Sequence, residues 1–183
     1  MSATVHQIFL ERRQSFCITT LANMLPSKYF ETTYILCMPY KGVYKPSNPK
    51  KYQGNPNNII YRSLWERKFM NYCDLNESIQ QWQSEEFWIP YVSPVDNRVH
   101  RYFPDFFIKY NDKNGALRTM VIEIKPKKQV AKPNTNPKRR TKAWANSVKT
   151  WMVNQAKWKA AKEFCADRNY EFKIMTEDDL GIK

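Results

Sequence analysis

The chain has 183 residues, 42% of them hydrophobic and 15% aromatic, and its formal net charge at pH 7 is +13. A chain of this length and hydrophobic content suits one globular domain with a buried core. The strongly basic balance predicts a polyanionic partner. No apolar run approaches the length of a membrane span, so we expect no membrane partner.

The cysteines and histidines show no pattern typical of a zinc site. No two cysteines form a CxxC pair, and neither histidine lies near a useful partner. Nothing in their spacing demands disulfides, which fits a reducing cytoplasm. Charged residues at positions 11–13 interrupt the early apolar stretch, so we expect no signal peptide. The protein is therefore expected to act inside a cell.

The first 62 residues differ in pattern from the rest. Residues 1–38 mix apolar residues with scattered charges, and Pro26 interrupts any helix, so we predict an N-terminal extension of unknown role. Residues 39–62 are rich in Tyr, Lys, Pro and Asn, which is typical of an extended basic arm rather than a packed element. One hypothesis is that translation starts at Met38, which mass spectrometry of the native N-terminus would test.

Regular elements are predicted from Ser63 onward. Ser63 and Glu66 form a capping-box pattern, which predicts a helix that ends near residues 76–77. Apolar and aromatic residues at 86–91 and 98–103 flank a turn rich in Pro, Asp and Asn, and this pattern predicts a β-hairpin.

Two more strands are predicted on either side of a tight turn. The first, 105–110, follows the strand breaker Pro104, and a turn at 111–115 joins it to 117–125, the clearest strand of the chain. The next segment, 127–142, is dense in Lys, Pro and Asn and is predicted to be a loop.

A long helix is predicted over residues 144–169, followed by a strand at 170–175 and a short helix from Thr176. The predicted inner face of the long helix consists of Val148, Met152, Ala156, Ala160 and Phe164, with Trp151, Gln155 and Trp158 beside it. Residues 63–183 are therefore expected to form one α/β domain with a mixed central sheet flanked by helices.

Two acids and one lysine on neighbouring predicted strands form the candidate site. Because side chains alternate along a strand, Glu123 and Lys125 point to the same face, while Ile122 and Ile124 point into the core. Asp105 begins the preceding strand, which one turn places antiparallel and adjacent. We expect the two carboxylates to converge near the sheet edge.

Such a cluster suits cleavage of a phosphodiester bond. The carboxylates of Asp105 and Glu123, with the carbonyl of Ile124, would form a hard oxygen site for Mg²⁺ or Mn²⁺. A bound metal acidifies water and polarises the phosphoryl oxygen. The ammonium of Lys125 would stabilise developing charge and offset the two carboxylates. Taken alone, a Glu-x-Lys triplet is more often a solvated strand face, so the Pro-Asp partner matters.

Several spaced blocks resemble known nucleases. Pro104-Asp105 and Glu123-Ile124-Lys125 match the motif of the PD-(D/E)xK nuclease superfamily. Further blocks are YRSLWE at 61–66, WQSE at 82–85, IPY at 89–91, RYF at 101–103, IEIKPKK at 122–128 and KWKAA at 157–161. Through these blocks, over about residues 39–182, the chain is similar to the head completion nucleases of T-even-type tailed phages and, more distantly, to the transposon-end endonuclease TnsA.

The resemblance implies a restriction-endonuclease-like fold and roles for four residues. Asp105 and Glu123 would be metal ligands and Lys125 the catalytic lysine, and Glu66 matches an acidic residue that completes such sites. Glu66 also has a plain structural role as the third residue of a capping box, and the two roles are compatible. The resemblance leaves residues 1–38 unexplained.

The resemblance also implies a biological setting, the completion of phage heads by a Mg²⁺-dependent endonuclease that acts on packaged DNA. It would act in the cytoplasm of the host cell or in association with the virion, with head or portal proteins as further partners. A homodimer stays open, because no interface signal is decisive. The rival reading is a head protein that grips DNA without cutting it. A sequence-specific transposase subunit is disfavoured because it normally needs a further recognition domain.

A basic segment after the candidate lysine is the predicted DNA contact. It contains no acid and includes Lys127, Lys128, Lys138, Arg139, Arg140 and Lys142, to which we add Arg62 from the first family block. The alternative is a solvated loop, but its position favours a flap that grips phosphates with little sequence preference. Gln155 is a candidate accessory residue near the scissile phosphate, although a buried glutamine more often satisfies a backbone group.

Overall fold

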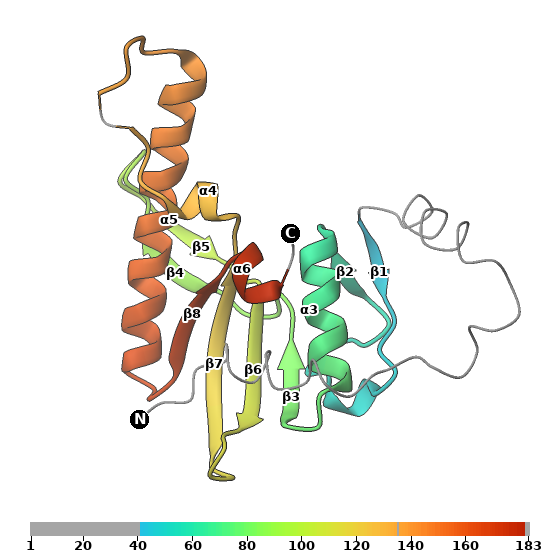
Figure 1. The fold of residues 1–183 in the computed structure, drawn as a ribbon. Coiled ribbons are helices and arrows are strands. Elements are labelled where there is room, and N and C mark those ends of the chain that lie inside the picture. The colour runs from blue at the N-terminus through green and yellow to red at the C-terminus, as the bar shows by residue number, and fades with distance from the viewer. Residues whose placement is uncertain (1–40, 135, 182–183) are drawn as a thin grey trace, which may run out of the picture.

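A computed structural model describes residues 41–134 and 136–181 of the chain (Figure 1). The predicted extension at 1–38 and the hypothesis about Met38 lie outside the described residues. Of the cysteines within them, Cys73 and Cys165 are both free and buried. No helix in these two ranges is long and apolar enough to cross a membrane.

A four-stranded mixed sheet forms the centre of the described fold. Its order is β3 (Ile79–Gln83), β6 (Phe106–Asn111), β7 (Leu117–Ile124) and β8 (Glu171–Met175). β3 and β6 pair antiparallel, as do β6 and β7, whereas β7 and β8 run parallel. The expected α/β fold with a mixed sheet is confirmed, and β6 and β7 are the adjacent antiparallel pair that the sequence predicts.

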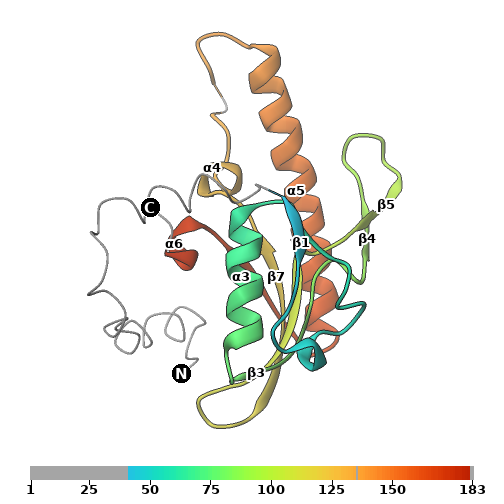
Figure 2. The same cartoon turned by 90° about the vertical axis from the view of Figure 1, so that its right-hand side faces the viewer.

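Helix α3 (Leu64–Leu75) and helix α5 (Lys142–Ala166) cover opposite sides of this sheet (Figure 2). Phe106 and Ile122 are register partners and share one buried cluster with Phe69 of α3. Phe172 of β8 packs on the other side, in the cluster that contains Ala161 of α5. Both predicted helices and the strand at the end of the long helix are confirmed.

A separate hairpin packs against α5 beyond the edge of the central sheet. Its strands β4 (Ile89–Val92) and β5 (Val99–Tyr102) pair antiparallel, as predicted. The inward side chains Ile89, Tyr91 and Tyr102 are buried against Ala161 of α5. The hairpin therefore brings Tyr102 under α5 and close to the end of β7.

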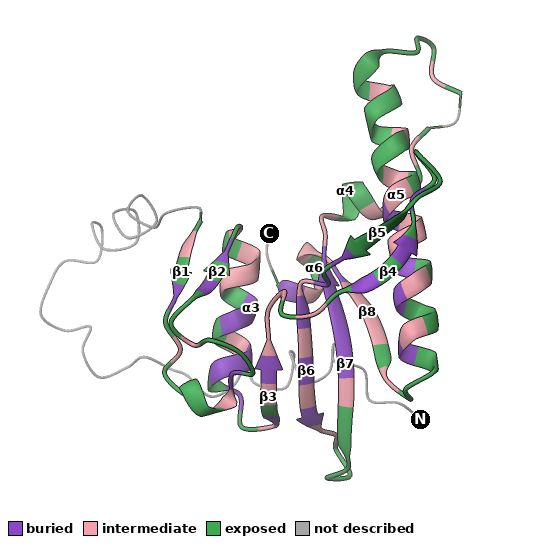
Figure 3. Ribbon diagram, turned by 180° about the vertical axis from the view of Figure 1, so that it is seen from behind, coloured by how far each residue is buried: buried purple, intermediate pink, exposed green. Residues whose placement is uncertain are grey.

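The predicted unpacked arm at 39–62 is wrong for the described residues. This segment forms β1 (Gly42–Tyr44), a 3-10 turn η1 (Pro49–Lys51) and β2 (Ile59–Tyr61), and β1 pairs with β2. Its four core residues are Tyr44, Tyr52, Ile59 and Tyr61, all at most 8% exposed. This segment lies along α3 on the side away from the central sheet, and its strands β1 and β2 carry buried, purple stretches (Figure 3).

A buried carboxylate of α3 explains why this polar segment packs. Asp74 is fully buried and accepts the backbone N–H groups of Ser47 at 2.7 Å and Asn48 at 3.0 Å. It also accepts the hydroxyl of Tyr44 at 3.4 Å. Asp74 thus satisfies turn N–H groups that would otherwise need water. This contact spans 26 or more residues, so local composition does not predict it.

The inner face of α5 agrees with the predicted one only in part, since Ala156, Ala160 and Phe164 are half-buried against the hairpin cluster. The buried residues are Asn154, Trp158, Ala161 and Cys165, whereas Met152 of the predicted stripe is 44% exposed. Apolar residues occur all around this helix, so its sequence periodicity does not identify one face. The first turns of α5 also project beyond the sheet (Figure 1), where little packs against them.

Three short elements complete the described fold. β3 was not predicted, because its sequence IQQWQ mixes glutamines with only two apolar residues. Helix α4 (Lys127–Val130) forms at the start of the predicted loop. Helix α6 (Glu177–Leu180) is the predicted terminal helix, and the N–H of Thr176 donates to Asp179 at 2.9 Å.

Candidate functional site

The carboxylate of Asp105 lies where the ladder between β6 and β7 ends. The last register pair is Phe106 with Ile122, since Pro104 ends the strand on one side. Beyond that pair, Oδ2 of Asp105 accepts the N–H of Ile124 at 2.7 Å. The side chain of Asp105 thus replaces a backbone partner of β7 and is held against the end of that strand.

Lys125 joins the two predicted carboxylates into one cluster. Its Nζ lies 3.0 Å from Oε1 of Glu123 and 3.4 Å from Oδ2 of Asp105. Glu123 and Lys125 share a face of the strand end, whereas Ile122 and Ile124 belong to the core cluster under α3. The structure therefore brings together the three side chains that the sequence predicts to converge.

Tyr102 of the hairpin is a fourth member of this cluster, which the sequence does not predict. Its hydroxyl donates to Oε2 of Glu123 at 2.7 Å, and Glu123 is 3% exposed. Burial, and then the charge of Glu123, raise the pKa of Tyr102, so the hydroxyl stays protonated as a donor. Lys157 of α5 lies over the Tyr102 ring, 5.6 Å from its centroid. Tyr102 and Lys125 thus hold the carboxylate of Glu123 from two sides.

The protonation of the cluster is governed by burial. Burial, and then the charge of Glu123, raise the pKa of Asp105 to about 7 against the opposing effects of Lys125 and the Ile124 N–H. Burial lowers the pKa of the Lys125 ammonium, but Asp105 and Glu123 outweigh this effect, so its pKa is raised. One ammonium therefore faces two carboxyl groups that repel each other.

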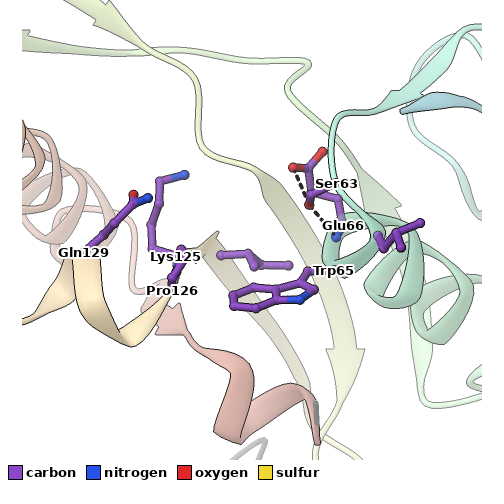
Figure 4. Close-up of a pocket in the computed structure, with 8 residues that line it drawn as sticks. Ser63, Trp65, Glu66, Lys125, Pro126 and Gln129 are labelled. Atoms are coloured by element: carbon purple, nitrogen blue, oxygen red, sulfur yellow. Dashed lines mark hydrogen bonds between the residues drawn. The ribbon is translucent and has the colours of Figure 1, made fainter. Parts of the chain in front are cut away.

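Glu66 lies at the start of α3 and serves as its cap. Its backbone N–H donates to Oγ of Ser63 at 3.1 Å, and that hydroxyl donates to Oε1 of Glu66 at 2.8 Å. Its Oε2 accepts the N–H of Arg62 at 2.7 Å. The predicted capping role is confirmed. Glu66 also faces the cluster across a pocket (Figure 4), and its charge adds to the raised pKa of Asp105.

The donor set at the cluster fits a hard divalent cation. Asp105 and Glu123 supply desolvated carboxylates, and one lysine leaves the pair with an uncompensated negative charge when both are ionised. The contacts of Asp105 with Ile124 and Lys125 both use Oδ2. Among residues 41–134 and 136–181, no three His, Cys, Asp or Glu side chains group closely enough to hold a metal. The candidate side-chain ligands for a metal in the described part of the chain are therefore Asp105 and Glu123.

Two of the predicted DNA-contacting residues are engaged with acids. Arg62 pairs through Nη1 with Oε2 of Glu85. Lys127 pairs with Asp178, with Nζ 2.7 Å from Oδ2. Both pairs are largely exposed and are exchangeable for phosphate contacts. The remaining predicted cations are exposed, namely Lys128, Lys138, Arg139, Arg140 and Lys142.

Gln155 is half-buried, and among the described residues no hydrogen bond joins its side chain to the cluster. Its neighbour Asn154 is instead the buried polar residue of α5, 6% exposed, and its Nδ2 lacks a hydrogen-bond partner among the described residues. Asn154, and not Gln155, therefore lies on the buried face of α5. An accessory role for Gln155 stays a prediction.

The fold and the cluster define a class of protein, an α/β nuclease-type domain with an acidic pair and a lysine at the end of adjacent strands. Residues 76–177 match the family described as TnsA-like endonuclease N terminal. The chain is also 41% identical over 147 residues to the head completion nuclease of Enterobacteria phage T4, covering 78% of this chain and 95% of that protein. The chain therefore belongs to the TnsA-like endonucleases and is a relative of the phage head completion nuclease.

Proposed function

We propose that this protein is a metal-dependent endonuclease that hydrolyses phosphodiester bonds of DNA. The observation that carries the proposal is the contact of Asp105, Glu123 and Lys125 at one end of the sheet in a chain of the endonuclease family. The net charge of +13 supports DNA as the polyanion.

The residues of the cluster have separate roles in this proposal. Asp105 and Glu123 would hold Mg²⁺ or Mn²⁺, with the carbonyl of Ile124 as a further oxygen donor. When bound, the metal supplies an acidified water and a Lewis acid for the phosphoryl oxygen. Lys125, kept protonated by its two acidic neighbours, stabilises the charge that develops on the phosphate oxygens. Tyr102 keeps Glu123 in place.

Glu66 completes the site from the opposite wall in this proposal. It caps α3, and its carboxylate faces Lys125 across the pocket (Figure 4). The negative charge of Glu66 orients the polar groups that contact the substrate. Helix α3 fixes the position of the Glu66 side chain.

The rival function is a head protein that grips DNA without cutting it. A protein that only binds DNA gains nothing from a buried and a half-buried carboxylate beside the phosphate, because they repel the backbone. The cost of burying them is visible in the raised pKa of Asp105. Metal-dependent hydrolysis requires such carboxylates as ligands, and we therefore favour the enzyme over the binding protein.

The name of the relative supports a proposed biological setting. The T4 protein is named a head completion nuclease. We propose that the present chain likewise acts on packaged DNA during virion assembly, in the host cytoplasm or on the virion. Head or portal proteins would then be its partners, and cutting both strands would call for a homodimer or for two successive nicks.

Metal-dependent nicking is the direct test of the proposed function. Incubation of supercoiled DNA with the full chain and Mg²⁺ or Mn²⁺ should yield open-circular and linear forms on an agarose gel. Excess EDTA should stop the reaction, and added Mg²⁺ should restore it. Binding of DNA without cleavage under any of these metals would instead establish the rival function.

A projecting basic arm supports DNA binding away from the cluster. We call basic arm the residues 131–134 and 136–149, that is, the loop after α4 with the first turns of α5 (Figure 1). Thr141 caps α5 by accepting the Trp144 N–H at 3.2 Å, and the Trp144 indole donates to the Asn134 carbonyl at 2.8 Å. The guanidinium of Arg140 lies 5.8 Å from the Trp144 ring centroid. The arm thus has internal order while its charged groups remain exposed.

Removing three charges of the basic arm should weaken binding on every DNA sequence. Each phosphate contact contributes about 0.9 to the slope of log K against log salt, so Ala at Lys138, Arg139 and Arg140 should flatten that slope by about 3. Fluorescence anisotropy between about 50 and 200 mM salt measures it. The matched control replaces Lys113, Lys159 and Lys162, exposed lysines at other places. An equal effect in both triple variants would mean that the arm contributes to DNA binding only through the net charge of the protein.

A further inference from the structure

A pocket opens beside the catalytic cluster, between α3 and the segment that follows β7. One wall is Ser63–Glu66 and the other is Ile124, Lys125, Pro126 and Gln129 (Figure 4). Its volume is about 410 Å³, within the range of about 300–1,000 Å³ typical of small-ligand sites. Lys125 and Glu66 belong both to this pocket and to the proposed active site, so an occupant would lie next to the scissile phosphate.

The lining combines four apolar residues with four polar ones, and three of the polar side chains, Ser63, Glu66 and Lys125, are already engaged with one another or with the cluster. Leu64 is 42% exposed here, although it is a large aliphatic side chain at the first turn of α3. The indole of Trp65 lies between the two walls (Figure 4). The hydroxyl of Ser63 is used by Glu66. Within the described residues, the side-chain amide of Gln129 makes no hydrogen bond, and it is exposed at the rim.

This lining matches a nucleobase better than a phosphate. A base has two flat apolar faces for Leu64, Trp65 and Pro126, and a polar edge for the free amide of Gln129. A phosphate would need several cations, and Lys125 is the single cation among the lining residues of the described chain. The phosphate therefore belongs at the cluster and the base in the pocket.

A base can enter such a pocket only after it leaves the helical stack. In duplex DNA the base edges are reached through the grooves and the base faces are covered by their neighbours. Extrusion of a base is least costly where the nucleotide is mismatched or already unpaired. We propose that the pocket at Leu64, Trp65 and Gln129 binds one unstacked nucleotide beside the cut, so that the enzyme prefers DNA with an unpaired nucleotide there. This inference rests on the proposed nuclease function.

The first test compares cleavage of a matched duplex with that of the same duplex carrying one unpaired nucleotide. Wild type should cut the unpaired substrate about tenfold faster or more, because extrusion no longer opposes the reaction. An abasic nucleotide at the same place should lose this advantage, since it is flexible but brings no base. Equal rates on the three substrates would overturn the pocket proposal while leaving the nuclease function intact.

Pocket variants assign the effect to this place. Leu64→Trp fills the pocket and should bring the rate on the unpaired substrate down to that on the matched duplex, and Gln129→Ala should lower the preference severalfold. Leu75→Trp is the matched control, because Leu75 is the exposed leucine, 55% exposed, at the other end of the same helix. A preference that persists in Leu64→Trp would overturn the assignment.

A binding readout separates the two proposals. With EDTA present, 2-aminopurine at the unpaired position reports base unstacking through its fluorescence. Wild type should change this signal relative to free DNA, and Leu64→Trp should abolish the change while Leu75→Trp retains it. If no DNA is cut with Mg²⁺ or Mn²⁺, the nuclease proposal fails and this assay still decides the pocket. An unchanged signal with bound wild type would overturn it.

Discussion

Replacing Lys125 by methionine should lower the rate of DNA cleavage by about 10²–10³ while DNA binding changes little. The ammonium contacts both carboxylates, and its side chain is 26% exposed, so water replaces it poorly. Methionine preserves the length and apolar stem of the side chain and removes the charge. Single-turnover cleavage with Mg²⁺ measures the rate, and anisotropy measures the affinity.

Two controls make the Lys125→Met result interpretable. Lys113→Met removes an exposed lysine from the turn between β6 and β7, at the far end of β7 from the cluster, and should cut DNA like wild type. Circular dichroism must show that Lys125→Met is folded, because the change leaves the buried Glu123 and the half-buried Asp105 with less compensation. A folded variant that cuts at the wild-type rate would remove Lys125 from the mechanism.

The candidate cluster could be predicted because its geometry is local. Asp105, Glu123 and Lys125 lie within 21 positions of one another, on strands joined by one tight turn. The alternation of side chains along 117–125 fixes which of them share a face. The spacing of these three residues in the sequence therefore predicts their arrangement in space.

The features of the fold and the site that the sequence does not predict depend on contacts between distant segments. Tyr102 reaches Glu123 only because the hairpin packs on α5, and no periodicity in RYF indicates where its hydroxyl points. The segment 41–62 packs because Asp74 is buried beneath its turns. On α5, Met152 of the predicted face is exposed and Trp158 is buried, because apolar residues occur on all sides of this helix and tertiary contacts decide which of them pack inward.

Asp105→Asn should abolish cleavage and at the same time stabilise the metal-free protein at alkaline pH. The first effect follows from the loss of an anionic metal ligand, since a neutral amide holds a divalent cation poorly. The second follows from the raised pKa of the Asp105 carboxyl, about 7 against an ordinary value of 3.8. The ionised side chain is disfavoured by burial and by Glu123, and asparagine avoids that cost.

The sign of the pH dependence distinguishes this cause from others. A carboxyl whose pKa is raised on folding binds its proton more tightly in the folded chain than in the unfolded one. Wild type therefore loses stability as the pH rises from about 4 through about 7, and asparagine does not. The difference in Tm between Asp105→Asn and wild type should be a few degrees at pH 8 and should shrink towards pH 4.

Asp112→Asn is the control of opposite sign. The backbone N–H of Ala116 and the guanidinium of Arg118 hold the pKa of Asp112 below its usual range, so its ionised form favours folding. Asparagine there should lower the Tm at neutral pH, and the deficit should vanish as the pH falls through the folded pKa. Thermal unfolding of both variants in EDTA tests the pair, over pH 4 to 8 for Asp105→Asn and extended below pH 3.8, the ordinary carboxyl pKa, for Asp112→Asn. A Tm for Asp105→Asn at or below wild type at pH 8 would mean that Lys125 and the Ile124 N–H outweigh burial, and that the cluster is built to hold two anions without a cation.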